Sequence, residues 1–265
     1  MSTDAKKIWK NKLIPDIVIP PAPPLFQSIT KLFIFNVLFL IGFPYFCYLI
    51  ITKWSVMYDI LHKAIQKSII HTKDYQKDEL ITEVWNLPVA QQYRDAVEYQ
   101  RREGYCCPTT QRCILKSIPS IKTEDLPIMK GGPASIDKYC SIVDKIGNGQ
   151  LSSTVIYGDD KYQSFIETLK KVNDPKYRIA INFLRSSLFG MKSPLWLPSN
   201  LLLSIFGGHF SPIIGYLEKE DLVAVFDVNH NYGLFLVKSE RLYDSISTYD
   251  LSSGKSRGIV ITTIH

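Results

Sequence analysis

Hydrophobic and polar residues follow two different patterns in the part of the chain after residue 76. Apolar residues first recur at helical spacing, and later they gather in short runs rich in β-branched residues. Helices are predicted at 79–85, 89–100, 109–117, 135–145 and 162–172. Strands are predicted at 178–184, 213–217, 222–228 and 259–264. Helices followed by antiparallel strands indicate an α+β domain with two packed halves and a cleft between them.

Two of these strands form a predicted hairpin that brings chemistry-bearing residues together. The runs 213–217 and 222–228 flank the charged residues 218–221, as in an antiparallel hairpin with a short polar turn. The start of the first strand then lies beside the end of the second. We therefore expect His209 close to Asp227, whose carboxylate would fix the tautomer of the imidazole and stabilise its charged form.

The N-terminal part of the chain has the pattern of a membrane anchor. Residues 1–30 are lysine-rich and then proline-rich, which predicts an extended tether. Residues 32–52 carry no charge, and at about 1.5 Å per helical residue they would span the roughly 30 Å hydrocarbon core of a bilayer. With Lys31 and Lys53 at its ends, segment 31–53 is predicted to be a single transmembrane helix. The alternative is a buried core helix.

The segment after the anchor, residues 54–75, has the pattern of a juxtamembrane amphipathic helix, with an ordinary packed surface helix as the alternative. Residues 76–265 then form the predicted catalytic domain. Lysines flank both ends of the anchor, so charge alone does not give its orientation. The apolar segment 186–206 is unusual for a connection, and it is expected to cover the cleft or to touch the membrane.

The composition limits which cell compartments and which classes of partner are expected. The 265 residues contain 46% hydrophobic residues and a formal net charge of +6, with basic and acidic residues interspersed, which argues against a nucleic-acid partner. The five cysteines show no paired CxxC spacing, so neither a disulfide framework nor a zinc site is indicated. A reducing compartment fits best, and we expect the catalytic domain to face the cytosol.

A base held by a carboxylate needs a nucleophile, and Cys106 is the candidate. Pro108 suits the first turn of a helix, which would lower the pKa of a thiol at its N-terminus. Cys106, His209 and Asp227 would then form a catalytic triad, and Gln100 would donate its side-chain amide to an oxyanion. The alternatives are a buried core thiol and a structural histidine, and the pattern alone leaves Cys107 as a rival nucleophile.

The sequence blocks around these residues are specific. Gly208-His-Phe-Ser-Pro-Ile213 is followed by Gly215-Tyr216, and Asp227-Val228 comes eighteen residues after the histidine. Asp244-Ser-Ile246 and Ser252-Ser-Gly-Lys-Ser-Arg-Gly258 come near the end. In these blocks the chain resembles the phytochelatin synthase family, glutathione γ-glutamylcysteinyltransferases of the papain-like cysteine peptidase clan. The resemblance covers roughly residues 80–265.

The resemblance assigns roles to single residues. The family has a glutamine six residues before its nucleophile and a tyrosine just before it, which correspond to Gln100, Tyr105 and Cys106 and make Cys106 the nucleophile. Arg185 resembles the family's arginine near the acyl-binding site. The resemblance thus implies substrate binding by Arg185, Tyr105 and Gly208, and a papain-like fold with a helical half and a sheet half behind the transmembrane helix.

The implied activity is transfer of γ-glutamylcysteine from glutathione through an acyl-enzyme, with a second glutathione as acceptor and glycine released. No bound cofactor or resident metal site is expected. Heavy-metal ions such as cadmium are expected as activators or as glutathione thiolate complexes. The sequence leaves open whether the protein forms a homodimer. The family's arginine and Lys-Tyr after the aspartate are here Asn229-His-Asn-Tyr232, so hydrolysis of glutathione or its conjugates is an alternative. Further alternatives are a membrane-surface cysteine hydrolase or acyltransferase and a non-catalytic scaffold.

Overall fold

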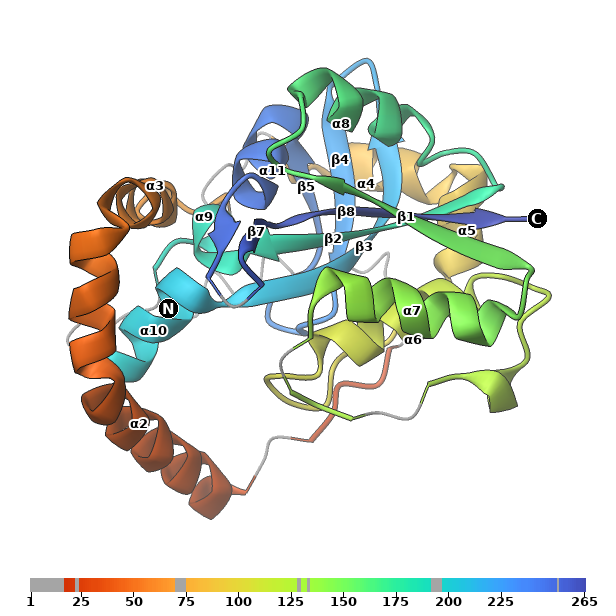
Figure 1. Cartoon of the computed structure of the whole chain (residues 1–265). Coiled ribbons are helices and arrows are strands. Elements are labelled where there is room, and N and C mark those ends of the chain that lie inside the picture. The colour runs from red at the N-terminus through yellow and green to blue at the C-terminus, as the bar shows by residue number, and fades with distance from the viewer. Residues whose placement is uncertain are drawn as a thin grey trace.

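The structure of the chain is a computed structural model in which a sheet lies between two layers of helices (Figure 1). It describes residues 17–21, 24–69, 75–127, 130–132, 134–191, 197–251 and 253–265. Most of the expected tether, part of the segment after the anchor, and the middle of the 186–206 segment therefore lie outside the described residues. The mixed architecture of helices and an antiparallel sheet agrees with the predicted α+β class.

The central sheet is antiparallel and has the strand order β1-β8-β2-β3-β4-β5. Its strands are β1 (Leu151–Tyr157), β2 (Tyr177–Leu184), β3 (Gly208–Leu217), β4 (Leu222–Asp227), β5 (Gly233–Lys238) and β8 (Gly258–Ile264). A separate two-stranded ladder joins β6 (Tyr249–Asp250) to β7 (Lys255–Ser256). The four predicted strands are present, whereas β1 and β5 were not predicted.

Both faces of the sheet are buried, and alternate residues of each strand enter different cores. Ala224 and Phe226 of β4 belong to one hydrophobic cluster, and Val223 and Val225 belong to the other. This is the period-2 alternation of a strand whose two faces are both covered. It explains why the strands read as nearly continuous apolar runs rather than as alternating apolar and polar residues.

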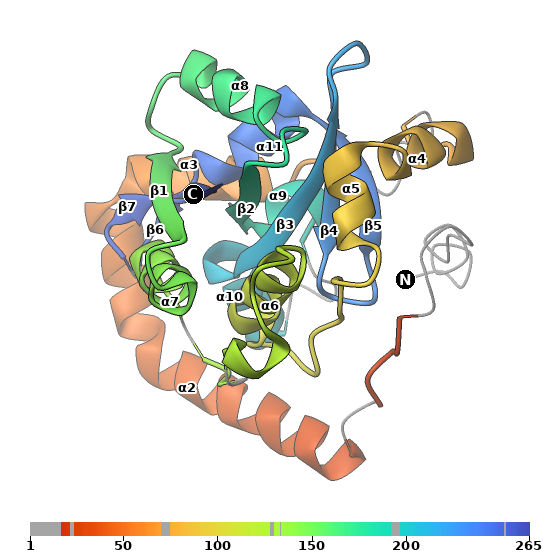
Figure 2. The same ribbon diagram turned by 90° about the vertical axis from the view of Figure 1, so that its right-hand side faces the viewer.

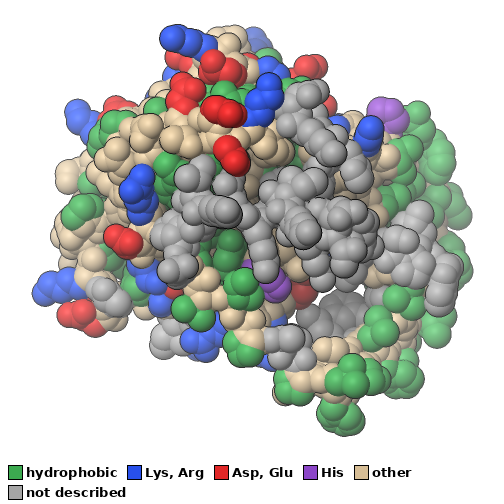
Figure 3. All heavy atoms as spheres, turned by 180° about the vertical axis from the view of Figure 1, so that it is seen from behind, with side chains coloured by type: hydrophobic (Ala, Val, Ile, Leu, Met, Phe, Trp, Pro, Cys, Tyr) green, Lys and Arg blue, Asp and Glu red, His purple; other side chains and the backbone are tan. Residues whose placement is uncertain are grey.

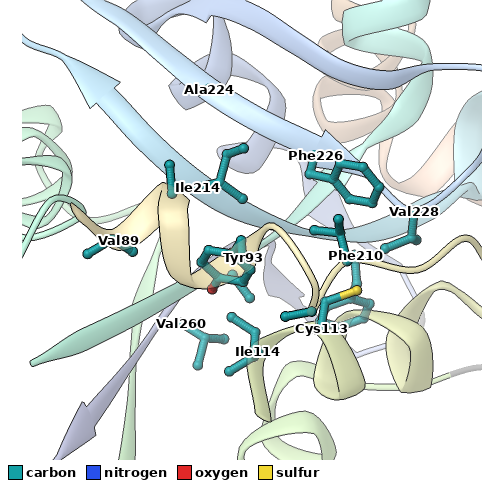
Figure 4. Packing of buried hydrophobic residues seen from close by; sticks show 14 of the residues in the cluster. Val89, Tyr93, Cys113, Ile114, Phe210, Ile214, Ala224, Phe226, Val228 and Val260 are labelled. Carbon is teal, nitrogen blue, oxygen red and sulfur yellow. The ribbon is translucent and has the colours of Figure 1, made fainter. Parts of the chain in front are cut away.

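The first core lies under four helices (Figure 4). They are α4 (Asp78–Trp85), α5 (Pro88–Tyr93), α6 (Cys106–Lys116) and α7 (Ile136–Gly147). The prediction of a helix over 89–100 was too long, because α5 ends at Tyr93 and residues 97–100 have no regular secondary structure. The backbone N–H of Gln100 donates to the Val228 carbonyl at 2.7 Å, so tertiary pairing replaces helical pairing there.

The second core lies on the opposite face, under α8 (Tyr162–Lys170), α9 (Arg185–Phe189) and α11 (Ser239–Ile246). Figure 1 shows α8 and α11 on one side of the sheet and α6 and α7 on the other. Helices thus cover both faces, which differs from the expected succession of a helical half and a sheet half along the chain. α8 was predicted at 162–172, and α11 was not predicted.

A buried arginine ties the first helical layer to the sheet. Arg178 on β2 is 1% exposed, and its guanidinium donates to Ser117 Oγ at 2.7 Å and to the Ser117 carbonyl at 2.9 Å. It also bonds to the carbonyls of Pro175 and Tyr177 and to the side chain of Gln92. Because these polar partners satisfy the guanidinium, the charge is tolerated in the interior.

The N-terminal helix is longer than predicted. α2 (Leu25–Thr52) includes residues 25–30 of the expected tether, so the extended segment ends earlier than expected. Pro44 lies inside α2, and the helix bends as it curves beneath the domain (Figure 2). By length and composition α2 is the one helix in the described part of the chain that is able to cross a membrane, and only 12% of its most apolar window is buried.

The two helices next to α2 form a third, smaller core. α3 (Trp54–Ala64) is shorter than the predicted 54–75 helix, and it buries Met57 and Ile60. α10 (Pro198–Phe206) comes from the apolar 186–206 segment and packs against both α2 and α3. Figure 3 shows hydrophobic side chains along the exposed part of α2. The C-terminal part of the apolar connection is therefore a helix that contacts α2.

Candidate active site

The candidate site is built around the start of β3, where the chain enters the sheet from α10. His209 is the second residue of β3, and its imidazole Nε2 lies 2.7 Å from Asp227 Oδ1 at the end of β4. The two side chains are 3% and 0% exposed, respectively. Phe183 on the neighbouring strand β2 meets the imidazole edge-on at 5.5 Å. The hairpin therefore brings His209 and Asp227 together as expected.

Asp227 is itself held by the turn that follows it. Its Oδ1 accepts the backbone N–H of Asn229 at 2.7 Å. Its Oδ2 is buried without a hydrogen-bond partner among the described residues. Because Nε2 of the His209 imidazole faces this carboxylate, Nδ1 is the ring nitrogen that is able to interact with a nucleophile on the opposite edge of the ring.

Cys106 is the group on that side. It is the first residue of α6, and its thiol lies close enough to His209 and to the backbone of Phe210 for both to act on its pKa. Burial raises the pKa of the Cys106 thiol, but the influence of His209 and Phe210 outweighs this effect, so the pKa is lowered. Cys106, His209 and Asp227 thus form one electrostatically coupled group, in which His209 and Asp227 are hydrogen-bonded.

The pKa of His209 moves in the opposite direction. Burial disfavours the imidazolium, but the charge of Asp227 and the Cys106 thiolate outweigh burial and raise the pKa of His209. A lowered thiol pKa and a raised imidazole pKa both favour transfer of the proton from sulfur to nitrogen. The surroundings of the pair therefore favour the thiolate and imidazolium forms.

The neighbouring cysteine has a different environment. Cys107 is 5% exposed and belongs to the first core, and burial raises the pKa of its thiol well above the ordinary value. Burial also raises the pKa of Cys113 and of Cys140 to about 12. These three thiols behave as core side chains.

Two groups are the candidates for stabilising an oxyanion. Tyr105 provides no side-chain cap for α6, so the N–H groups at the start of this helix are left for a negative charge. Gln100 is 4% exposed, and its backbone pairs with Val228, one residue after Asp227. Its Oε1 has no hydrogen-bond partner in the described part of the chain.

The remaining predicted site residues lie in the same region. Tyr105 precedes Cys106, accepts a hydrogen bond from Arg102 at 2.9 Å, and lies so close to Gly131 that a Cβ there would overlap its ring. Arg185 follows β2 directly, and its backbone N–H donates to the Gly207 carbonyl at 3.2 Å, just before Gly208.

The side chain of Arg185 has an acidic partner that the sequence did not indicate. Its Nη1 lies 3.0 and 3.1 Å from the two carboxylate oxygens of Glu103, and Asn229 Nδ2 also donates to Glu103 at 3.4 Å. Burial lowers and the Glu103 charge raises the pKa of Arg185, with a net rise. Glu103 is the third residue before Cys106, so this ion pair lies next to the candidate nucleophile.

Sequence reasoning also missed Arg257. The side chain is 3% exposed, and its Nε has no hydrogen-bond partner among the residues described. A Cβ at Gly208 would lie only 2.4 Å from its Nη1, so a side chain at position 208 would displace the guanidinium. Arg257 belongs to the Ser-Ser-Gly-Lys-Ser-Arg-Gly block, which was the available signal. The nearby carboxylate of Asp250 favours the charged form of Arg257.

Other chemistry is limited in the described residues. They contain no group of three or more His, Cys, Asp or Glu side chains that could hold a metal ion. An apolar groove lies between α2 and α10, but the residues that line it do not include Cys106.

A comparison with known proteins finds a family match that includes part of this site. Residues 141–259 match the family model described as phytochelatin synthase, which confirms the resemblance for this part of the chain. The match includes His209, Asp227 and Arg257, whereas Gln100 and Cys106 precede it. None of the curated proteins searched matches the chain.

Proposed function

We propose that this chain, with its phytochelatin synthase match, is a membrane-anchored transferase that moves γ-glutamylcysteine from glutathione to an acceptor amine. The observation that carries the proposal is that His209, at the start of β3, is hydrogen-bonded to Asp227 and acts directly on the thiol of Cys106 at the start of α6. The family match supports a phytochelatin synthase-like activity. The antiparallel sheet carrying the histidine, with the cysteine on a helix that packs against it, supports a papain-like arrangement.

In the first step the Cys106 thiolate attacks the carbonyl carbon of the Cys-Gly peptide bond. The N–H groups at the start of α6 and the Gln100 amide stabilise the oxyanion that forms. The carbon–nitrogen bond then breaks, and His209 gives its proton to the departing glycine amine. The product is a γ-glutamylcysteinyl thioester on Cys106, and Asp227 keeps the imidazole oriented during the transfer.

In the second step the amine of another glutathione attacks the thioester carbonyl. His209 accepts the proton of that amine, the carbon–sulfur bond breaks, and Cys106 returns to the thiolate. The new peptide bond lengthens the chain of γ-Glu-Cys units by one. Heavy-metal ions enter this reaction as thiolate complexes of glutathione, that is, as part of the substrate.

Two arginines are suited to the carboxylates of glutathione. Arg257 presents a buried guanidinium beside Gly208, and its Nε is unpaired among the residues described. Arg185 lies at the surface of the site and pairs with Glu103. A substrate carboxylate that binds Arg185 must replace Glu103, and the planar guanidinium allows two parallel hydrogen bonds to either carboxylate.

The anchor is α2. Its length and apolar composition support a transmembrane helix, and three of its polar side chains bond within the helix. Thr30, Asn36 and Thr52 donate to the carbonyl four residues earlier, at 2.9, 2.7 and 2.8 Å. We place the catalytic domain at the cytosolic face, where the pool of reduced glutathione and free thiols fits the chemistry.

A second candidate function is hydrolysis, in which water replaces the acceptor amine. The observation that favours it is Asn229-His-Asn-Tyr232, where the family has basic residues. Asn229 is tied to Glu103 and to Asn231. Without the additional cations the site holds an acceptor glutathione less firmly, and water then competes better for the thioester.

The test is incubation of the full chain, in detergent or in lipid nanodiscs, with glutathione in the presence and absence of cadmium. Products are followed by mass spectrometry. Oligomers of γ-Glu-Cys support transfer, and γ-Glu-Cys with glycine alone supports hydrolysis. Cys106→Ala should abolish both products, whereas Cys107→Ala should retain them. Turnover that survives Cys106→Ala would refute the mechanism.

A further inference from the structure

The surface between α2 and α10 contains a groove that the catalytic chemistry does not use. The groove has a volume of about 150 Å³. Its walls include Phe39, Gly42, Phe46 and Leu49 of α2 and Leu202 and Phe206 of α10. Phe46 and Phe206 meet edge-on across it, with ring centroids 6.5 Å apart. Two segments far apart in the sequence therefore build one apolar surface.

The groove suits an apolar occupant rather than water. Its walls present almost no polar atoms, and a water molecule needs two to four polar partners to be held in a cavity. A Cβ built at Gly42 would meet no heavy atom within 4 Å, so the chain leaves open space at this point of the wall. Apolar cavities of comparable size, on the order of 150 Å³, stay dry and take apolar guests.

The surroundings of α2 indicate what the occupant is, provided that the helix spans a bilayer as in the proposed function. The groove continues into the exposed apolar side of α2, where Leu38, Leu40 and Ile41 are 57, 68 and 72% exposed. The medium along this surface is then the acyl chains of lipids. We propose that the groove binds one acyl chain of a membrane phospholipid, whose phosphate lies at Lys53.

Lys53 lies at the correct end of the groove for this role. Positions 42, 46, 49 and 53 are spaced by four, three and four residues, which keeps them on one side of a helix. Lys53 ends α2 as its C-cap residue, and its ammonium lies 5.9 Å from the ring centroid of Tyr249. A cation at the membrane end of an apolar groove complements the negative phosphate of a lipid headgroup.

The position of α10 links this site to the candidate active site. α10 ends at Phe206, and His209 follows three residues later on β3. The Gly207 carbonyl between them accepts the backbone N–H of Arg185. A lipid chain in the groove therefore packs against the helix that leads directly into the catalytic strand.

The test is photo-crosslinking of the full chain in vesicles that contain phosphatidylcholine with a diazirine on one acyl chain. Labelled peptides are then mapped by mass spectrometry. Peptides that contain residues 198–206 should be labelled. Gly42→Trp fills the groove and should reduce this labelling about tenfold. Leu40→Trp adds the same bulk to the exposed side of α2, and labelling of α10 should stay within twofold.

A second pair of variants tests the headgroup end. Lys53→Glu should reduce several-fold the phospholipid that stays bound to the chain in native mass spectrometry, whereas Lys67→Glu, an exposed lysine after α3, should not. Equal labelling of α10 in Gly42→Trp and the parent would overturn the lipid site, as would competition by a hydrophobic glutathione S-conjugate, which would assign the groove to substrate.

The outcome is separable from that of the proposed function. If the chain does not float with the vesicles, the anchor is refuted and the lipid site with it, whereas glutathione turnover can still be measured in solution. If turnover is absent but α10 is labelled and Gly42→Trp removes the label, the lipid site stands without the transferase.

Discussion

Two charged clusters border the start of α6, and they differ in burial. Cys106, His209 and Asp227 form a cluster in which His209 and Asp227 are almost completely buried. Arg185 and Glu103 form an ion pair that reaches the surface through Glu103, with side chains 12 and 42% exposed. In the buried cluster the Asp227 charge raises the pKa of His209, and His209 lowers the pKa of Cys106. Because Glu103 is exposed, a substrate carboxylate is able to replace it on Arg185.

The largest expected effect is on the buried cluster and separates the two adjacent cysteines. Cys106→Ala should lower kcat by on the order of 10⁴-fold or more, because no other group takes the role of the nucleophile. Cys107→Ala should change kcat by only a few-fold, since burial keeps that thiol protonated. Product formation from glutathione, measured by mass spectrometry, distinguishes them. Equal losses in both variants would contradict the assignment of Cys106.

Asp227→Asn should lower kcat by on the order of 10²- to 10⁴-fold. The parent needs Cys106 deprotonated and His209 protonated, so activity falls below the Cys106 pKa and above the His209 pKa. Because the Asp227 charge raises the His209 pKa, its removal should move the alkaline limb of the pH profile to lower pH. A profile that keeps its alkaline limb in place would show that Asp227 does not act through His209.

Gln100→Leu tests the oxyanion role within the same cluster. Loss of one oxyanion donor costs on the order of 10²- to 10³-fold in kcat, and KM should change little because the oxyanion exists only in the transition state. The melting temperature of the variant serves as a control, because Gln100 is buried and its backbone pairs with Val228. A loss expressed mainly in KM would argue for a ground-state contact instead.

The buried cluster was easier to predict than the surface pair. The local sequence predicts the hairpin of β3 and β4, because apolar runs flank the charged residues 218–221. This hairpin places His209 beside Asp227. Asp221 at φ 51° supplies the turn conformation. A bulge between Ile213 and Gly215, where a Cβ on Gly215 would approach Leu87 at 2.8 Å, was not visible in the pattern.

The missed elements have physical causes. β1 has the sequence Leu-Ser-Ser-Thr-Val-Ile-Tyr. Its polar positions are tolerated because, among the described strands, it lies at the edge of the sheet and pairs with β8 alone. α5 was predicted too long because Glu98 and Gln100 are held by Cys113 and Val228, which are distant in sequence. The pairing of Glu103 with Arg185 joins residues 82 positions apart and leaves no local signal.

The smallest expected effects come from the surface pair, and here the two partners should act in opposite directions. Glu103→Gln removes the carboxylate that occupies Arg185, so KM for glutathione should fall about two- to fivefold. Arg185→Gln removes the guanidinium itself, so KM should rise about tenfold with kcat nearly unchanged, as for loss of uniform binding. Initial rates over a range of glutathione concentrations separate the two constants.

The charge of Glu103 also acts on the buried cluster, which gives this prediction a second readout. Glu103 raises the pKa of Cys106, as a weaker influence than burial and His209. Without it the thiolate persists to lower pH, so the acid limb of kcat/KM should move to lower pH in Glu103→Gln. The matched control is Glu167→Gln, because Glu167 forms an exposed ion pair with Lys170 on α8. This variant should change neither KM nor the acid limb of the kcat/KM profile. A rise in KM for Glu103→Gln would mean that Glu103 contacts the substrate itself, and the two clusters would then form a single binding surface.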